Sequence, residues 1–119
     1  MSKTVVLGAS TNPARVSYSA VHRLKNHGEE VIPIGIKKGS VADIDIINER
    51  PELEDVDTIT LYLNPQRQEA YYDYILSLQP RRIIFNPGTE NPTLVKKAKE
   101  RGIDTEYACT LVMLATGAY

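Results

Sequence analysis

Cysteine is almost absent from this sequence, which contains one, Cys109, among 119 residues. A disulfide within the chain is therefore excluded, and this usage is typical of a protein of the reducing cytosol. His22 and His27 are too few and too scattered to complete a zinc site with that cysteine. No apolar run approaches the roughly 20 residues that a membrane span needs. We expect a cytoplasmic protein without a secretory signal, because the first residues lead directly into a predicted strand.

Charge of one sign is also lacking. The formal net charge is −1, which gives no electrostatic reason to expect nucleic acid or an anionic membrane as a partner. Hydrophobic residues make up 42% of the chain and charged residues 24%, as in an ordinary globular protein. With this length and composition, we expect residues 1–119 to form a single domain with its own core.

Two phosphate-binding motifs are missing as well. The fingerprint G-x-G-x-x-G begins at Gly8, but Ser10 replaces its second glycine and Pro13 its third. The motif G-x-x-x-x-G-K-[ST] does not occur, which excludes a P-loop. The acid that binds a ribose hydroxyl in dinucleotide folds is replaced by Lys37 and Lys38. These lysines favour a phosphorylated ribose, as in NADP or coenzyme A; a solvated pair in a surface loop is the alternative.

The stretch that remains, residues 4–17, has the features of a phosphate site. Thr4 to Leu7 is short, apolar and β-branched, as expected of a buried parallel strand. The small residues Gly8, Ala9 and Ser10 would let a ligand approach their backbone N–H groups. A helix predicted to start near Ser17 adds the partial positive charge of its N-terminus. Arg15 could clamp a phosphate, although an ordinary surface arginine is the alternative.

Strands alternate with helices along the rest of the chain, which predicts a parallel sheet with helices on both faces. We expect a three-layer, Rossmann-like α/β fold with a five-stranded parallel sheet in the order 3-2-1-4-5. The predicted strands are Thr4–Leu7, Glu30–Ile36, Asp57–Leu63, Arg81–Asn86 and Ile103–Tyr107. The predicted helices are Ser17–His27, a segment from Asn64-Pro65 to Pro80, a segment from Asn91-Pro92 to Gly102, and Thr110–Ala115, which we expect to cover an edge.

The segment 37–56 is the least legible part of the sequence. It contains one short extended piece, Ile44–Ile47, and a turn or short helix around Pro51–Glu54. The predicted strand order places a topological switch between the first and fourth strands, and ligands of such folds bind there, outside the carboxyl ends of the strands. The turns at Asn64 and at Asn86-Pro87-Gly88 follow two of these strands, so we expect them to line a cleft.

No set of residues indicates a reaction. Cys109 is the candidate nucleophile, but a reactive thiolate needs a nearby base or positive field, and neither histidine is predicted to lie there. We therefore expect Cys109 to pack and expect no catalysis.

The residues also carry a family likeness. Gly8-Ala9-Ser10-x-Asn12-Pro13-x-Arg15-x-Ser17-Tyr18, followed by Gly28-x-x-Val31-Ile32-Pro33-Ile34, resembles the CoA-binding Rossmann-like family. This group of small stand-alone proteins is related to the N-terminal domain of the succinyl-CoA synthetase alpha subunit. The resemblance implies a five-stranded domain that holds coenzyme A across the strand ends, with phosphates at the first loop and the adenosine end near the lysines. The implied cofactor-binding residues are Gly8, Ala9, Ser10, Asn12, Arg15, Ser17, Lys37, Lys38, Asn64, Asn86, Pro87 and Gly88.

Three interpretations of function stay open at this point. The first is a protein that binds coenzyme A or acyl-CoA without evident catalysis. The second is an NAD(P)-binding oxidoreductase or redox sensor that uses the same loop. The third is an interaction domain with a vestigial site, which could form a homodimer through an exposed sheet edge.

Overall fold

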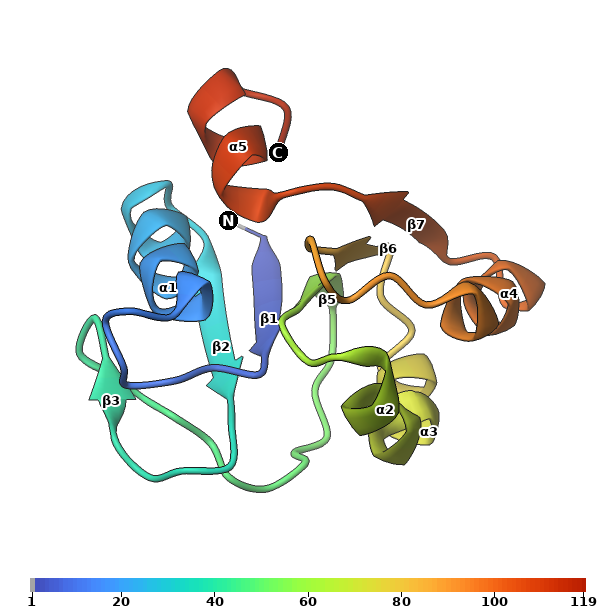
Figure 1. Ribbon diagram of the computed structural model, residues 1–119, viewed down its shortest axis with the longest axis horizontal. Helices are drawn as coiled ribbons and strands as arrows, with labels where there is room; N and C mark the ends of the chain where they lie inside the picture. The colour runs from blue at the N-terminus through green and yellow to red at the C-terminus, as the bar shows by residue number, and fades with distance from the viewer. Residues whose placement is uncertain (1) are drawn as a thin grey trace.

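The computed structural model describes residues 2–119, which form a central sheet of five parallel strands (Figure 1). The order across the sheet is β2-β1-β5-β6-β7. The α/β fold class and the five predicted strands are thereby confirmed. In β1, β5 and β6 nearly every residue is buried, because helices cover both faces. The strands are β1 Lys3–Leu7, β2 Glu30–Ile34, β5 Val56–Leu61, β6 Arg82–Phe85 and β7 Asp104–Tyr107.

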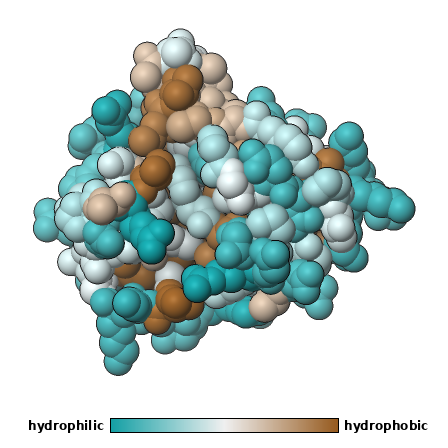
Figure 2. Space-filling model, in the orientation of Figure 1, coloured by the Kyte–Doolittle hydropathy of each residue, from teal (hydrophilic) through white to brown (hydrophobic). Residues whose placement is uncertain are grey.

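The helices divide into two groups, one on each face of the sheet (Figure 1). On one face lie α2 Pro65–Gln68, α3 Tyr72–Ser77 and α4 Pro92–Glu100. There, Ile75 and Leu94 join the larger cluster of buried apolar side chains. On the other face lie α1 Val16–Asn26 and α5 Thr110–Thr116, which contact each other. The prediction that the last helix covers an edge is wrong, because α5 lies beside α1 over the sheet. Hydrophobic side chains gather over α5 (Figure 2).

The strand order agrees with 3-2-1-4-5, but a different segment fills the third place. Outside β2, Ile47 forms a single parallel bridge with Ile34 and donates its N–H to the Pro33 carbonyl at 2.9 Å. With the Ile47 bridge in the third place, β2, β1, β5 and β6 take the places 2, 1, 4 and 5 of the predicted order, and β7 lies beyond β6. The strand predicted at Asp57–Leu63 therefore pairs with β1 on the other side. The topological switch lies between β1 and β5, and the turn at Asn86 follows the next strand.

Three local predictions need correction. Helix α1 begins at Val16, one residue before the predicted start at Ser17, and its N-cap is Arg15. The helix predicted from Asn64 to Pro80 is broken into α2, a 3-10 turn at Glu69–Tyr71 and α3. In segment 37–56, a small antiparallel pair of β3 Ser40–Val41 and β4 Ile44–Asp45 takes the place of one extended piece. No helix forms at Pro51–Glu54.

Candidate binding site at the carboxyl ends of the strands

The loop after β1 is packed tightly against the end of β5. Gly8 has a φ of +102°, and a Cβ atom placed on it would lie 3.0 Å from the carbonyl carbon of Tyr62. Glycine is therefore required at this position both for its backbone conformation and for its close approach. The N–H groups of Gly8 and Ala9 both donate to the Ile34 carbonyl at 2.9 Å. The expectation that these two donors face a ligand is wrong, because β2 already occupies them.

The loop after β2 lies directly against the loop after β1. A Cβ atom on Gly35 would overlap the Ala9 carbonyl oxygen, and one on Gly39 would stand 2.5 Å from Cγ2 of Thr11. Between these glycines, Lys37 and Lys38 are exposed. The fold thus brings the two predicted lysines beside the first loop.

Asn48 holds the lysine loop in place. Its Nδ2 donates to the Gly35 carbonyl at 2.9 Å and to the Lys37 carbonyl at 3.0 Å. Two hydrogen bonds from one side chain fix the path of the backbone on which the lysines stand. Asn48 lies in the segment that the sequence left unassigned, so it was missed as a supporting residue.

The N-terminus of α1 has no acceptor from the rest of residues 2–119. Its N-cap, Arg15, makes no side-chain cap, and the first turn contains no acidic residue. The N–H groups of Val16 and Ser17 have no hydrogen-bond acceptor within these residues, although Tyr18 N–H donates to the Arg15 carbonyl at 3.1 Å. Ser17 is 3% exposed, and its hydroxyl makes no hydrogen bond with residues 2–119. These donors, with the helix dipole, form a place for an anion.

A short turn shapes the approach to that helix. Asn12 Oδ1 accepts from Ala14 N–H at 3.0 Å, and the Asn12 carbonyl accepts from Arg15 N–H at 3.0 Å. The Ser10 hydroxyl accepts from Asn12 N–H at 3.1 Å. Asn12 and Ser10 therefore support the loop, while the N–H groups of Ser10 and Thr11 have no acceptor within residues 2–119.

At each of the other helices that follow a strand, an asparagine side chain accepts from at least one N-terminal N–H. Asn64 caps α2 by accepting from Arg67 N–H at 2.9 Å, and Asn91 caps α4 by accepting from Thr93 and Leu94. The first N–H of α5, from Thr110, donates to Asn86 Oδ1 at 2.8 Å. Among the four helices of residues 2–119 that begin after a sheet strand, α1 is thus the one whose N-terminus has no side-chain acceptor.

Asn86 is a structural residue in this arrangement. It is 2% exposed and donates through Nδ2 to the Thr60 hydroxyl at 2.7 Å and to the Leu61 carbonyl at 2.8 Å. Together with the bond from Thr110, these contacts use the hydrogen-bonding groups of its side chain. Pro87 and Gly88, predicted with it, are exposed in the following turn, where Gly88 N–H donates to Glu90 at 2.9 Å.

The sequence did not predict a second buried hydrogen-bond network, which centres on Gln68. Gln68 is fully buried and donates through Nε2 to the carbonyls of Leu63 and Thr89, each at 2.8 Å. Its Oε1 accepts from Asn91 at 2.9 Å. This side chain ties the loop after β5 to the loop after β6. Nothing in the sequence distinguishes Gln68 from a solvent-exposed helical glutamine.

Tyr62 brings a buried hydroxyl to the switch. Burial raises the pKa of this phenol to about 12, and its oxygen has no hydrogen-bond partner within residues 2–119. Thr60 and Thr110 lie nearby, but their hydroxyls bond to each other at 2.8 Å. Cys109 is half-buried just before α5. That its thiol packs stays a prediction.

Two cavities of the structure lie away from these loops. They have volumes of about 380 and 760 Å³ and lie along β7 and α4 at the side of the sheet. We place the candidate site at the loops nevertheless, because the open N-terminus of α1 and the two predicted lysines lie there. Residues 2–119 contain no cluster of three metal-ligating side chains. They also contain no helix of the length and hydrophobicity that crossing a bilayer requires.

Comparison with known families decides the relationship. A family model described as "CoA binding domain" matches residues 2–115. The chain belongs to this CoA-binding family. The resemblance noted from the sequence is thereby confirmed, and the fold that it implied is the one observed. No curated protein matches the chain significantly.

Three solved structures share the fold of this chain. A crystal structure described as an uncharacterized protein shares 55% identity with a TM-score of 0.97, covering 100% of this chain and 98% of that one. A hypothetical protein from Pyrococcus horikoshii OT3 has 23% identity and a TM-score of 0.81, covering 95% and 81%. A Thermus thermophilus protein, cell-free ID.343, has 20% identity and a TM-score of 0.85, covering 99% and 90%. These last two show the fold alone.

Proposed function

We propose that this protein binds coenzyme A or an acyl-CoA, with the diphosphate at the N-terminus of α1. The observation that carries the proposal is the contrast among helix N-termini at this edge. Asn64 and Asn91 cap α2 and α4, and Asn86 accepts from the first N–H of α5, whereas no side chain of residues 2–119 accepts from the N-terminus of α1. An anion there would gain several N–H donors and the helix dipole without displacing an internal bond.

Coenzyme A has a second anionic group, the 3′-phosphate, for which Lys37 and Lys38 are the candidates. The contacts of Gly35 and Gly39 with the first loop keep these lysines close to it. Arg15, exposed at the N-cap of α1, is a further cation for the phosphates. Asn64, Pro87 and Gly88 would line the far side of the ligand, while Asn86, Asn12 and Ser10 support the loops. The proposal includes no reaction.

Calorimetry and thermal shift with five ligands test the proposal. Coenzyme A and acetyl-CoA should raise Tm and bind more tightly than NAD and NADP, because ligands of the folded state stabilise it. Equal shifts with NADP and coenzyme A would favour the NAD(P) interpretation and overturn ours. If no nucleotide binds, the interaction-domain interpretation holds instead.

The lysines are tested with 3′-dephospho-CoA as the fifth ligand. Lys37→Ala combined with Lys38→Ala should weaken coenzyme A binding about tenfold and leave dephospho-CoA nearly unchanged, since two charge-assisted contacts are lost. Lys96→Ala with Lys99→Ala, a pair on α4, is the matched control and should change neither. Equal losses for both ligands would remove the lysines from the 3′-phosphate.

A further inference from the structure

We propose that the outer edge of β7 and the groove beside α4 bind an extended segment of a partner protein as a sixth strand. The segment would turn an apolar residue flanked by acidic ones toward α4 and basic residues toward the opposite face. This inference is independent of coenzyme A binding, since it concerns the side of the sheet and not the strand ends.

The edge of β7 offers unpaired backbone groups. Asp104 N–H donates to the Arg81 carbonyl and Ala108 N–H to the Phe85 carbonyl, each at 3.1 Å. Residues 104, 106 and 108 thus point their backbone groups toward β6, and those of Thr105 and Tyr107 point outward. No other segment of residues 2–119 pairs with them. The opposite edge differs, because the Ile47 bridge covers β2. An open edge is a template for a further strand.

A groove runs along this edge. Its volume is about 760 Å³, and its lining includes Val95, Lys96 and Lys99 of α4 with Thr105 and Tyr107 of β7. Tyr107 is 54% exposed, and its ring meets Phe85 edge-on with centroids 5.5 Å apart. Tyr107 and Val95 provide an apolar floor for one side chain of an added strand.

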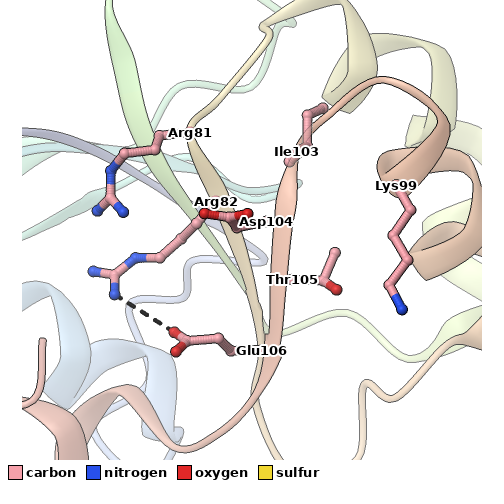
Figure 3. A pocket seen from close by; sticks show the side chains of 7 residues that line it. All are labelled: Arg81, Arg82, Lys99, Ile103, Asp104, Thr105 and Glu106. Atoms are coloured by element: carbon pink, nitrogen blue, oxygen red, sulfur yellow. Dashed lines mark ion pairs between the residues drawn. The ribbon is translucent and has the colours of Figure 1, made fainter.

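The charges on the two faces of β7 define the partner's pattern. Figure 3 shows Thr105 and Lys99 on one side of the strand and Asp104 and Glu106 on the other, toward the arginines. Glu106 pairs with Arg82 at 3.5 Å, whereas Asp104 forms no ion pair within residues 2–119. An incoming strand would therefore place carboxylates near the lysines of α4 and a base near Asp104.

A second copy of this chain fits the edge poorly. Two antiparallel β7 strands related by a two-fold axis pair residues whose side chains share a face. A register centred on Thr105 sets Asp104 against Glu106 twice, and one centred on Glu106 sets that residue against itself. A register centred on Tyr107 opposes no like charges, but it is short, because β7 ends at Tyr107 and α5 begins at Thr110. Directly opposed like charges destabilise a strand pair. The charge pattern thus favours a partner of different sequence.

A fluorescent seven-residue peptide, Thr-Glu-Arg-Val-Arg-Glu-Thr, tests this pattern. Its glutamates and valine share one face and its arginines the other. Anisotropy should show saturable binding that is about fivefold tighter than that of Thr-Arg-Glu-Val-Glu-Arg-Thr, in which the charges exchange faces. Hydrogen exchange should show new protection at the amides of Thr105 and Tyr107. Equal binding of the two peptides, or unchanged exchange at saturation, would overturn the proposal.

Two variants sharpen the test. Lys99→Glu should weaken the first peptide about fivefold, while Arg23→Glu, a charge reversal on α1, should not. Thr105→Pro removes an outward N–H without removing a bond to β6, so it should abolish binding. If that variant does not fold, Lys99→Glu and the exchange data still decide. Protection that grows with protein concentration in the absence of peptide would identify a second copy and also overturn the proposal.

Discussion

Asn86 shows why a polar residue in a loop after a strand is not by itself a ligand contact. The turn Asn86-Pro87-Gly88 follows β6, where ligands of such folds bind, and this position suggested a role in the cleft. The side chain instead joins β5 to the first N–H of α5 and is shielded from solvent. Its neighbours Pro87 and Gly88 remain exposed. The difference lies in hydrogen-bonding partners from segments far away in the sequence.

Asn86→Ala should lower the free energy of unfolding by about 2–4 kcal/mol, because it removes hydrogen-bond partners from buried groups of two segments, β5 and α5. Asn64→Ala, which removes an exposed cap, should cost about 1 kcal/mol. Urea denaturation measures both values. Coenzyme A affinity of the folded Asn86→Ala protein should stay near that of the parent. A large loss of affinity without loss of stability would make Asn86 a ligand residue.

At the scale of elements, the open N-terminus of α1 lowers the stability of the ligand-free protein but leaves N–H donors available to the proposed ligand. Val16, the first residue of α1, is 52% exposed and adds no acceptor for the helix donors. Val16→Asp should raise the stability of the ligand-free protein by about 0.3–1 kcal/mol, because a carboxylate interacts favourably with the helix dipole. The same carboxylate should weaken coenzyme A binding by repelling its phosphates.

Val16→Asn is the matched control for that charge, since it has nearly the same shape. Thermal unfolding without ligand and calorimetry with coenzyme A compare the two variants. Equal affinities for coenzyme A in both would show that the phosphates lie away from α1.

The elements also show what the sequence could and could not predict. All five strands were predicted to within two residues, because continuous β-branched and apolar runs between proline and glycine signals are local patterns. The helix starts at Asn64-Pro65 and Asn91-Pro92 were predicted for the same reason. Segment 37–56 was not, since its hairpin and the Ile47 bridge depend on contacts with β2. For the candidate site, the alternation of strands and helices predicted which loops lie at the carboxyl ends of the strands, and it placed Lys37 and Lys38 in one of them. It could not reveal that Ile34 occupies the N–H groups of Gly8 and Ala9, because that bond joins two strands.

At the scale of the whole molecule, Tyr119, which follows α5, contacts the first strand of the sheet. Tyr119 Oη lies 2.6 Å from the Thr4 hydroxyl, and the Arg82 guanidinium stands 4.4 Å from the centre of its ring. Arg82 is 6% exposed and also donates to the Tyr119 carbonyl at 3.0 Å and to the Thr58 hydroxyl at 2.9 Å. The cluster thereby holds α5 onto the sheet at the amino ends of the strands, opposite the candidate site.

Tyr119→Ala should therefore destabilise the protein by about 2–4 kcal/mol, because it removes a largely buried ring that also covers a buried guanidinium. Tyr119→Phe keeps the ring and loses only the bond to Thr4, so it should cost about 1 kcal/mol. Urea denaturation gives the two values, and hydrogen exchange should accelerate in α5 more than in β1 for the alanine variant alone. Coenzyme A affinity should remain unchanged in both, since the ring lies at the other end of the strands from the lysines and the α1 N-terminus. Equal costs for the two variants would mean that the hydroxyl, and not the ring packed against Arg82, holds the last helix in place.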